Sequence, residues 1–289
     1  PKTNAPSMIL GDFQLTTISG GVFRIDAGTM FGVVPKVLWQ RVVDVDANNL
    51  MTSATNCVLI ETGEKTILIE TGYGSKFSEK KRRIHGAEPG DPLVENLAAQ
   101  GIGVEQVDMV ILSHLHFDHA GGATQLDDQG NPRPTFPNAT YVAQRLEWVN
   151  ATANFPELQG AYPQDNLLPL AAAGQLQLID GDVEIVPGIR AEVNGGHTAG
   201  HQSLFIESGG ETAVFIGDIC PMAAHLPPLW CMAYDVDLLQ TRRAKPELLG
   251  RIAEHGWWAL FDHDPEIAAA RLQRDAKRGF VVAEALPQL

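Results

Sequence analysis

Three histidines and an aspartate lie within six residues of this sequence, at His114, His116, Asp118 and His119. Imidazole nitrogens and carboxylate oxygens bind zinc in proteins, at about 2.0–2.2 Å, and they also suit manganese and iron. A glycine pair at 121–122 allows tight backbone geometry behind these side chains. A lone histidine is usually an ordinary core or surface residue, but this density after an apolar stretch predicts a metal site.

Three further candidate ligands follow apolar stretches later in the chain. His197 lies in a glycine-bounded loop, Asp218 follows Gly217, and His263 stands between two aspartates. Each has an ordinary interpretation when taken singly, as a loop histidine or a turn-capping aspartate. Because each follows a predicted strand, as His114 does, we expect one sheet edge to carry all of them.

The elements that must position these residues are strands at 107–112, 189–193, 212–216 and 257–261, each ending just before a candidate ligand. Strands and helices are interspersed, which predicts an α/β (α+β) fold of packed sheets with helices outside, in one domain over 1–289 with a loose tail at 1–7. The other expected elements are strands at 8–18, 20–26, 139–143 and 176–179, a structured loop at 27–39, hairpins at 56–61 with 65–70 and at 203–207 with 212–216, and helices at 94–101, through Trp148, at 236–254 and at 265–277.

The chain is acidic, with 35 Asp and Glu against 21 Lys and Arg and a formal net charge of −14. Such a chain lacks the electrostatic footprint of a nucleic-acid or anionic-membrane binder, so we expect a small-molecule partner. The three cysteines show no CxxC pair, and their odd number argues against a disulfide framework. We therefore expect a cytoplasmic protein, and a periplasmic or secreted location stays open because a removed signal peptide would leave no trace.

The order HxHxDH, then GHT, then GD, then a late His resembles the metallo-β-lactamase superfamily over nearly the whole chain. The segment Leu68-Ile-Glu70-Thr-Gly72 is also similar to that family, with Glu70 where Asp is usual. The resemblance implies a four-layer αββα sandwich with the metals at one edge of the paired sheets.

The resemblance also implies a dinuclear centre of two divalent ions, with zinc preferred and manganese, iron or cobalt as alternatives. A hydroxide bridging ions about 3.5–4 Å apart would be the nucleophile, and Asp118 would also orient it or pass a proton to the leaving group. The implied ligands are His114, His116 and His197 for the first metal, Asp118, His119 and His263 for the second, and Asp218 between them.

Asp218 narrows the resemblance, because true metallo-β-lactamases generally lack a bridging aspartate. The chain is more similar to the branch of N-acyl-homoserine lactonases and methyl parathion hydrolase-like enzymes. That branch implies a lactone substrate, such as an acyl-homoserine lactone, with aryl-esterase and phosphotriesterase activities beside it. An apolar pocket would suit such substrates, and the residues expected to line it are Phe31, Phe136, Trp148, His225, Trp230 and Tyr234.

Two alternatives remain open. A phosphodiester or nucleotide hydrolase of the same superfamily would need Lys or Arg facing the metals, and Arg133 and Arg145 are the nearest candidates. A non-catalytic metal-binding scaffold disagrees with the presence of all seven ligands. Exposed apolar loops also suggest a homodimer.

Overall fold

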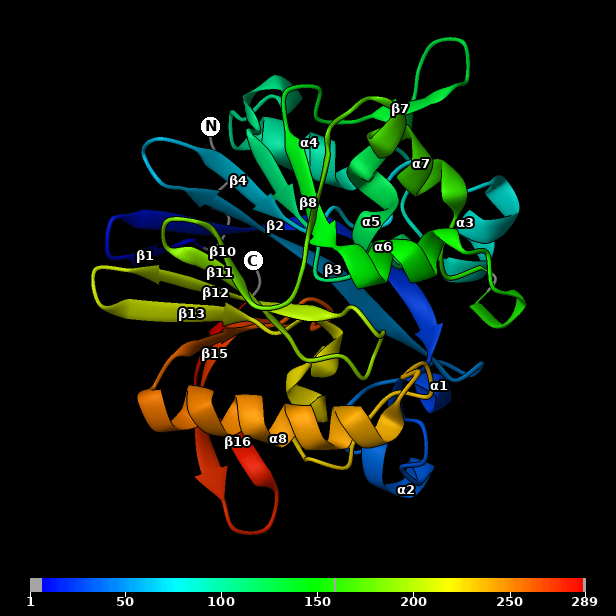
Figure 1. Ribbon diagram of the computed structural model, residues 1–289. Coiled ribbons are helices and arrows are strands. Elements are labelled where there is room, and N and C mark those ends of the chain that lie inside the picture. The colour runs from blue at the N-terminus through cyan, green and yellow to red at the C-terminus, as the bar shows by residue number, and fades with distance from the viewer. Residues whose placement is uncertain (1–6, 159, 288–289) are drawn as a thin grey trace.

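The computed structural model describes residues 7–158 and 160–287. Its strands form two seven-stranded sheets and one small two-stranded sheet (Figure 1). The tail expected at 1–7 lies outside the described residues except for Ser7, which begins the first strand. The first sheet contains β1 (Ser7–Leu10), β2 (Phe13–Asp26), β3 (Leu50–Glu61), β4 (Thr66–Ile69), β5 (Met109–Ile111), β8 (Thr140–Gln144) and β9 (Leu176–Ile179), in that order.

The second sheet has antiparallel hairpins at its sides and one parallel pair, β13 and β14, inside it. Residues 107–112, 189–193, 212–216 and 257–261 contain strands, as expected. This sheet contains β10 (Val183–Val186), β11 (Ile189–Val193), β12 (Gln202–Ser208), β13 (Glu211–Phe215), β14 (Trp258–Leu260), β15 (Ile267–Asp275) and β16 (Gly279–Pro287), and the small sheet pairs β6 (Thr124–Leu126) with β7 (Pro132–Pro134).

Alternation along the strands divides the interior into three apolar layers. In β3, Val58 and Ile60 pack between the two sheets, whereas Leu59 faces the helices outside the first sheet. In β13, Phe215 faces the first sheet and Val214 faces the helix outside the second. The layers are therefore helix, sheet, sheet, helix, which confirms the predicted αββα sandwich.

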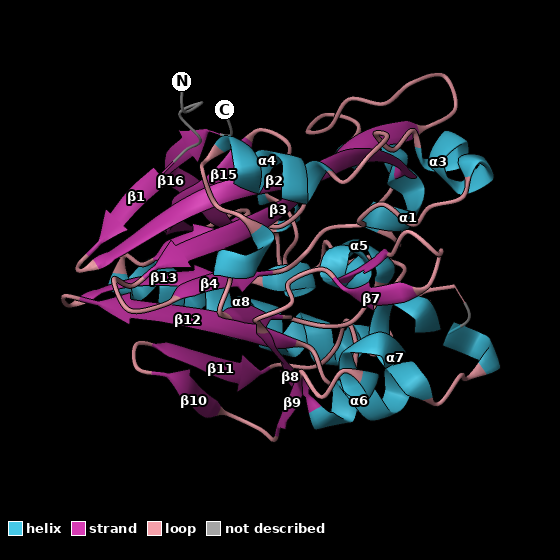
Figure 2. Cartoon of the chain, turned by 90° about the horizontal axis from the view of Figure 1, so that it is seen from above, coloured by secondary structure: helices cyan, strands magenta, loops and turns pink. Residues whose placement is uncertain are grey.

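The helices cover both outer faces and gather at one end of the sheets. Leu93 of α4 and Leu167 of α7 pack on the first sheet, and Leu249 of α8 packs on the second. Figure 2 shows α1, α3 and α5 at the end opposite the β12–β13 turn. The helices are α1 (Ala27–Phe31), α2 (Lys36–Trp39), α3 (Glu79–His85), α4 (Pro92–Ala99), α5 (Phe117–Ala120), α6 (Arg145–Thr152), α7 (Gln164–Ala172) and α8 (Leu238–His255).

The helix expected at 265–277 was wrong, because these residues form β15. Its Ala, Leu, Gln and Arg residues favour a helix in isolation, but pairing with β14 and β16 on either side overrides that propensity. The single strand expected at 8–18 is a hairpin turning at Gly11, whose φ of +57° suits glycine. The loop expected at 27–39 contains two short helices, α1 and α2.

No helix among the described residues is long and apolar enough to cross a membrane.

A buried lysine of α8 holds the backbone of residues 225–230, a segment between β13 and α8. Lys245 of α8 is fully buried, and its Nζ donates hydrogen bonds to the backbone carbonyls of His225, Pro227 and Trp230. This segment leads into residues 232–236, which line the main cavity. The ammonium thus holds the cavity wall by satisfying carbonyls that no strand satisfies.

We expect Lys245→Met to lower the free energy of unfolding by about 3 kcal/mol, because it leaves buried carbonyls without a donor. Urea denaturation followed by circular dichroism measures the loss. The matched control is Lys277→Met at an exposed position, which should change stability by less than about 0.5 kcal/mol. Equal effects of the two substitutions would contradict this role.

Candidate metal centre

The candidate ligands reach one point from four chain segments that follow strands of both sheets. His114 comes three residues after β5, and α5 carries Asp118 and His119. The remaining ligands come from the second sheet: His197 in the β11–β12 loop, Asp218 in the turn after β13, and His263 after β14. The prediction that strand ends deliver these residues is confirmed.

The first group of converging atoms contains His114, His116, His197 and Asp218. The Nδ1 atom of His116 lies 3.0 Å from Nε2 of His114 and 3.0 Å from Nε2 of His197. Asp218 Oδ2 lies 3.0 Å from the same His197 nitrogen. Three ring nitrogens and a carboxylate oxygen thus point at one small volume.

The second group contains His119, Asp218, Asp262 and His263. The Nε2 atoms of His119 and His263 are 3.2 Å apart, and Asp218 Oδ1 lies 3.2 Å from His263 Nε2. The Asp118 carboxylate lies beside this group, with Oδ2 at 3.6 Å from His263 Nε2. Asp218 belongs to both groups, and Asp262 is a member that the sequence analysis did not name.

Partners on the far side of three of the rings, those of His197, His263 and His119, fix their orientation. His197 Nδ1 lies 3.0 Å from Asp235 Oδ1, and His263 Nδ1 lies 2.7 Å from the Ala54 carbonyl oxygen. His119 Nδ1 faces Glu70 Oε2 at 3.5 Å. These partners hold the proton on Nδ1 of each of the three rings. The lone pair of Nε2 is then available to a metal.

Glu70, where the resemblance led us to expect Asp, contacts two parts of the histidine segment. Its Oε1 accepts a hydrogen bond from the backbone N–H of Ser113 at 2.7 Å, while Oε2 faces His119. The longer side chain therefore connects the turn after β4 to both ends of the histidine segment.

Two further buried side chains hold the loop backbones. Glu147 accepts hydrogen bonds from the Leu115 N–H and the Thr198 hydroxyl, and so joins the first histidine loop to the loop of His197. His201 Nε2 accepts from the Asp218 N–H at 3.0 Å. Gly217 permits this approach, because a Cβ there would lie 2.6 Å from the His201 ring and its φ is +64°.

Charge and burial shift the pKa values in opposite directions within the cluster. Burial, together with the neighbouring imidazoles, lowers the pKa of His114 and of His116 well below its usual value. Burial would also lower the pKa of His197, but Asp218 and Asp235 outweigh it and raise that pKa to about 10. Burial raises the pKa of Asp262 to about 8. In the absence of metal, the cluster therefore binds protons. Cations that bind to the same atoms would displace these protons.

The donor set fits divalent cations. Asp218 Oδ1 and both carboxylate oxygens of Asp262 are buried and accept no hydrogen bond from the described residues. Asp218 still faces the His197 and His263 rings, but a buried carboxylate without a hydrogen-bond partner among the described residues, as at Asp262, is costly, and a cation beside it removes that cost.

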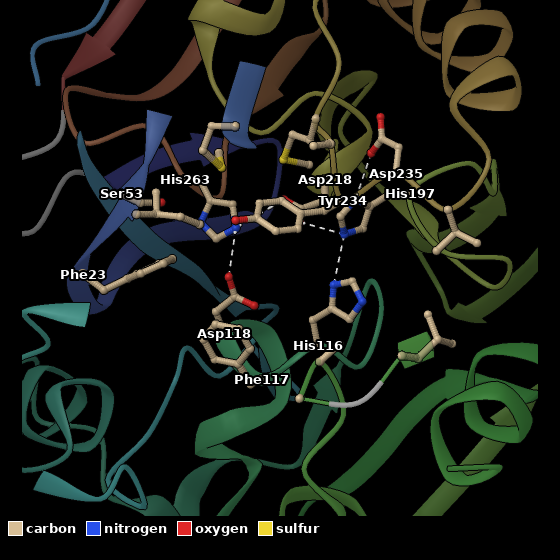
Figure 3. Close-up of a pocket in the computed structure, with 18 of the residues that line it drawn as sticks. Phe23, Ser53, His116, Phe117, Asp118, His197, Asp218, Tyr234, Asp235 and His263 are labelled. Atoms are coloured by element: carbon tan, nitrogen blue, oxygen red, sulfur yellow. Dashed lines mark hydrogen bonds and ion pairs between the residues drawn. The ribbon is translucent and has the colours of Figure 1, made fainter. Parts of the chain in front are cut away.

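The cluster forms the floor of a cavity of about 670 Å³. His116, Asp118, His197, His263 and Tyr234 line it, and the Tyr234 ring appears between His263 and His197 in Figure 3. None of the described residues that line it is a lysine or an arginine. Its walls are largely apolar and are made by Phe23, Ile25, Met30, Phe117, Leu158 and Met232.

Of the six residues expected to line the pocket, the structure places Tyr234 there. Phe136 is fully buried in the core between the first sheet and its helices, and Trp148 packs against the same core. The Phe31 ring stacks on His225, with centroids 4.6 Å apart, and meets Trp230 edge-on behind the cavity wall. These five side chains support the cavity from behind or lie away from it.

Two of the wall residues that sequence reasoning missed, Phe23 and Phe117, come from β2 and α5. Phe23 follows the register shift between Ser19 and Val22 in the long strand β2, and Phe117 lies inside the histidine segment itself. Their rings meet edge-on at 6.4 Å. The position of Phe117 between two candidate ligands was an available indication, whereas Phe23 reaches the site through the register of β2 and β3.

The fold and the site define a metallo-β-lactamase architecture. Residues 51–273 match the metallo-beta-lactamase superfamily model, and the chain belongs to this superfamily. It is 31% identical over 170 residues to an N-acyl homoserine lactonase of Bacillus cereus, over 55% of this chain and 61% of that protein. It is 32% identical over 162 residues to the lactonase AiiA of Bacillus thuringiensis subsp. kurstaki, over 53% and 58%. The chain thus spans about three-fifths of the length of these curated relatives.

Solved structures agree over the whole fold. A probable metal-dependent hydrolase from Staphylococcus aureus superposes with a TM-score of 0.87 at 33% identity, over 96% of this chain and 100% of that one. AidC, a dizinc quorum-quenching lactonase in complex with a product, gives 0.80 at 23% identity, over 98% and 97%. At this identity, the similarity to AidC shows a shared fold only.

His225 provides a pH test at a residue outside the two groups of metal-binding atoms. Its ring is buried against Phe31, its Nε2 donates to the Met30 carbonyl oxygen at 2.8 Å, and burial lowers its pKa to about 3. The unfolded chain takes up a proton near pH 6.5 and the folded chain does not, so stability is kept above pH 6.5 and falls as the pH drops toward 3.

We expect His225→Gln, which keeps a donor but does not titrate, to remove about 2 kcal/mol of the stability loss between pH 6 and pH 4.5. Urea unfolding of both proteins at the two pH values measures it. Parallel losses in wild type and variant would show that His225 is protonated in the folded state.

Proposed function

We propose that this chain is a dinuclear metal-dependent hydrolase that opens a neutral ester-like substrate, a lactone with an apolar acyl chain. Aryl-ester and phosphotriester cleavage would be side activities. The observation that carries the proposal is a largely apolar cavity, without lysine or arginine among its described lining residues, directly above the His and Asp cluster. The curated relatives, which are N-acyl homoserine lactonases, support it.

His114, His116 and His197 would hold one cation, His119, His263 and Asp118 the other, and Asp218 would contact both. When bound, such cations supply a water of lowered pKa and polarise the substrate carbonyl. The remaining tasks belong to the chain: it must bind the acyl chain, orient the carbonyl and move one proton.

Asp118 is the group placed to move that proton. It lines the cavity with its Oδ2 3.6 Å from His263 Nε2, whereas the lining carboxylate of Asp235 is paired with His197 Nδ1 on the side away from the cluster. In lactone opening the ring oxygen leaves as an alkoxide and must gain a proton, which Asp118 can take from the attacking water and pass on.

Tyr234 is the group placed to orient the carbonyl. Its ring lies over the cluster (Figure 3), and its hydroxyl now donates to Thr29 Oγ1 at 2.6 Å. A substrate carbonyl entering the cavity would replace Thr29 as the acceptor. Phe23, Phe117 and Met232 would meanwhile contact the acyl chain and exclude water.

The phosphodiesterase alternative has no support at the cavity. Arg145 pairs with Asp180 at 3.1 Å on the surface, and Arg133 is exposed on β7. Neither lines the cavity, and a dianionic or monoanionic substrate would meet Asp118, Glu157 and Asp235 there.

We expect protein loaded with Zn, Mn or Fe to hydrolyse an acyl-homoserine lactone fastest, an aryl ester and a phosphotriester more slowly, and bis-(p-nitrophenyl) phosphate least. Ring opening releases acid, which a pH indicator follows. Removal of the metals with a chelator should abolish all four activities, and re-addition should restore them. Dominant phosphodiesterase activity would reject the proposal.

We expect Tyr234→Phe to lower kcat/KM for the lactone about 10- to 100-fold, because loss of one aligned donor to a developing oxyanion has at least this effect. Steady-state kinetics with metal analysis of the same samples checks it. The matched control is Tyr141→Phe, a buried tyrosine in β8 outside the cavity, which should leave kcat/KM nearly unchanged. An unchanged kcat/KM in Tyr234→Phe would exclude the hydroxyl from the reaction.

A further inference from the structure

Asp262 is a buried acid without a hydrogen-bond donor. It follows β14, between Phe261 and His263, and the residue is only 1% exposed. The backbone carbonyl accepts from the Asn56 N–H at 2.7 Å, so the main chain is fixed. Both carboxylate oxygens, in contrast, accept no hydrogen bond from the described residues.

The Asp262 carboxylate is aimed at the second group of metal-binding atoms. One of its oxygens lies in a set with ligand atoms of His119, Asp218 and His263, all within 4.8 Å of one another. Asp218 Oδ1, in the same set, also accepts no hydrogen bond. Asp218 is paired with the His197 and His263 rings, whereas Asp262 lies beside it without a hydrogen-bond partner among the described residues, which is a costly arrangement for a buried carboxylate unless a cation lies beside it.

We propose that Asp262 is an additional ligand of the second cation, an inference that rests on the proposed dinuclear centre. The second position then has three carboxylates, from Asp118, Asp218 and Asp262, and two imidazoles. The first position has three imidazoles and shares one carboxylate. Because oxygen-rich sites favour harder cations and imidazole suits zinc, the two positions differ in preference: a hard divalent ion such as Mn²⁺ in the second and Zn²⁺ in the first.

The test compares Asp262→Asn with Asp235→Asn, which changes the partner of His197 in the first group. Metal content by mass spectrometry, chelator competition with Mn²⁺ and Zn²⁺, and the Mn²⁺ electron paramagnetic resonance signal are measured on full-length protein. Wild type should bind two cations per chain. Asp262→Asn should weaken the second cation roughly tenfold or more and reduce Mn²⁺ against Zn²⁺, while Asp235→Asn should weaken the first.

The metal-free proteins give a second readout. Asp262→Asn and Asp262→Ser remove a buried acid whose two oxygens have no hydrogen-bond partner in the described residues. Without metal, both variants should therefore melt at or above the wild-type temperature, and the gain in melting temperature on adding Mn²⁺ should shrink. Lower metal-free melting of both variants would overturn the assignment, because it would mean that the acid already has a favourable partner in the protein.

Two outcomes separate the failures. Full-strength binding of both cations by Asp262→Asn, with unchanged metal preference, overturns the role of Asp262 and leaves the dinuclear centre intact; it would fit a protonated acid that donates to Asp218. A single bound cation in the wild-type protein overturns the dinuclear centre and this inference with it.

Discussion

The crowding of imidazoles and carboxylates at one buried point is the constraint on which the rest of this structure depends. Nitrogen atoms of His116 and His197 lie 3.0 Å apart, and those of His119 and His263 lie 3.2 Å apart. Groups of this kind repel when protonated together and are costly when unpaired, so their positions must be imposed by the surrounding chain. Asp218, between the two groups, lowers the repulsion because its carboxylate faces rings from both.

The positions of the imidazoles and carboxylates are held by side chains that join the loops, as well as by the sheets. Glu147 connects the loops of His116 and His197, and Glu70 connects the turn after β4 to the histidine segment. His201 holds the backbone of Asp218, which Gly217 allows to approach. Each of these partners comes from a different strand end, so the site exists only when both sheets have packed.

Local order in the sequence predicted packed sheets with helices outside and a set of candidate ligands at strand ends, whereas the αββα arrangement was implied by the family resemblance. An apolar strand followed by His or Asp is visible along the chain, and its repetition predicts convergence. The local pattern does not reveal how segments far apart in the sequence pack against each other. Residues 265–277 have helical propensity but form an inner strand, since β14 and β16 flank them. Phe136 and Phe23 are equally apolar in the sequence, yet one fills the core and the other lines the cavity. Asp262 is adjacent to a ligand, but only its burial without a donor distinguishes it from Asp264, which accepts three backbone N–H groups.

The cavity wall and the metal-binding cluster are not independent parts. Phe23 packs edge-on against the His263 ring at 6.0 Å and against Phe117 at 6.4 Å, and both phenylalanines line the cavity. The same rings therefore keep water from the cluster and present an apolar surface to a substrate. Lower local polarity strengthens every charge interaction beneath them. A substitution at Phe23 would therefore change both the apolar surface of the cavity and the surroundings of the His263 ring beneath it.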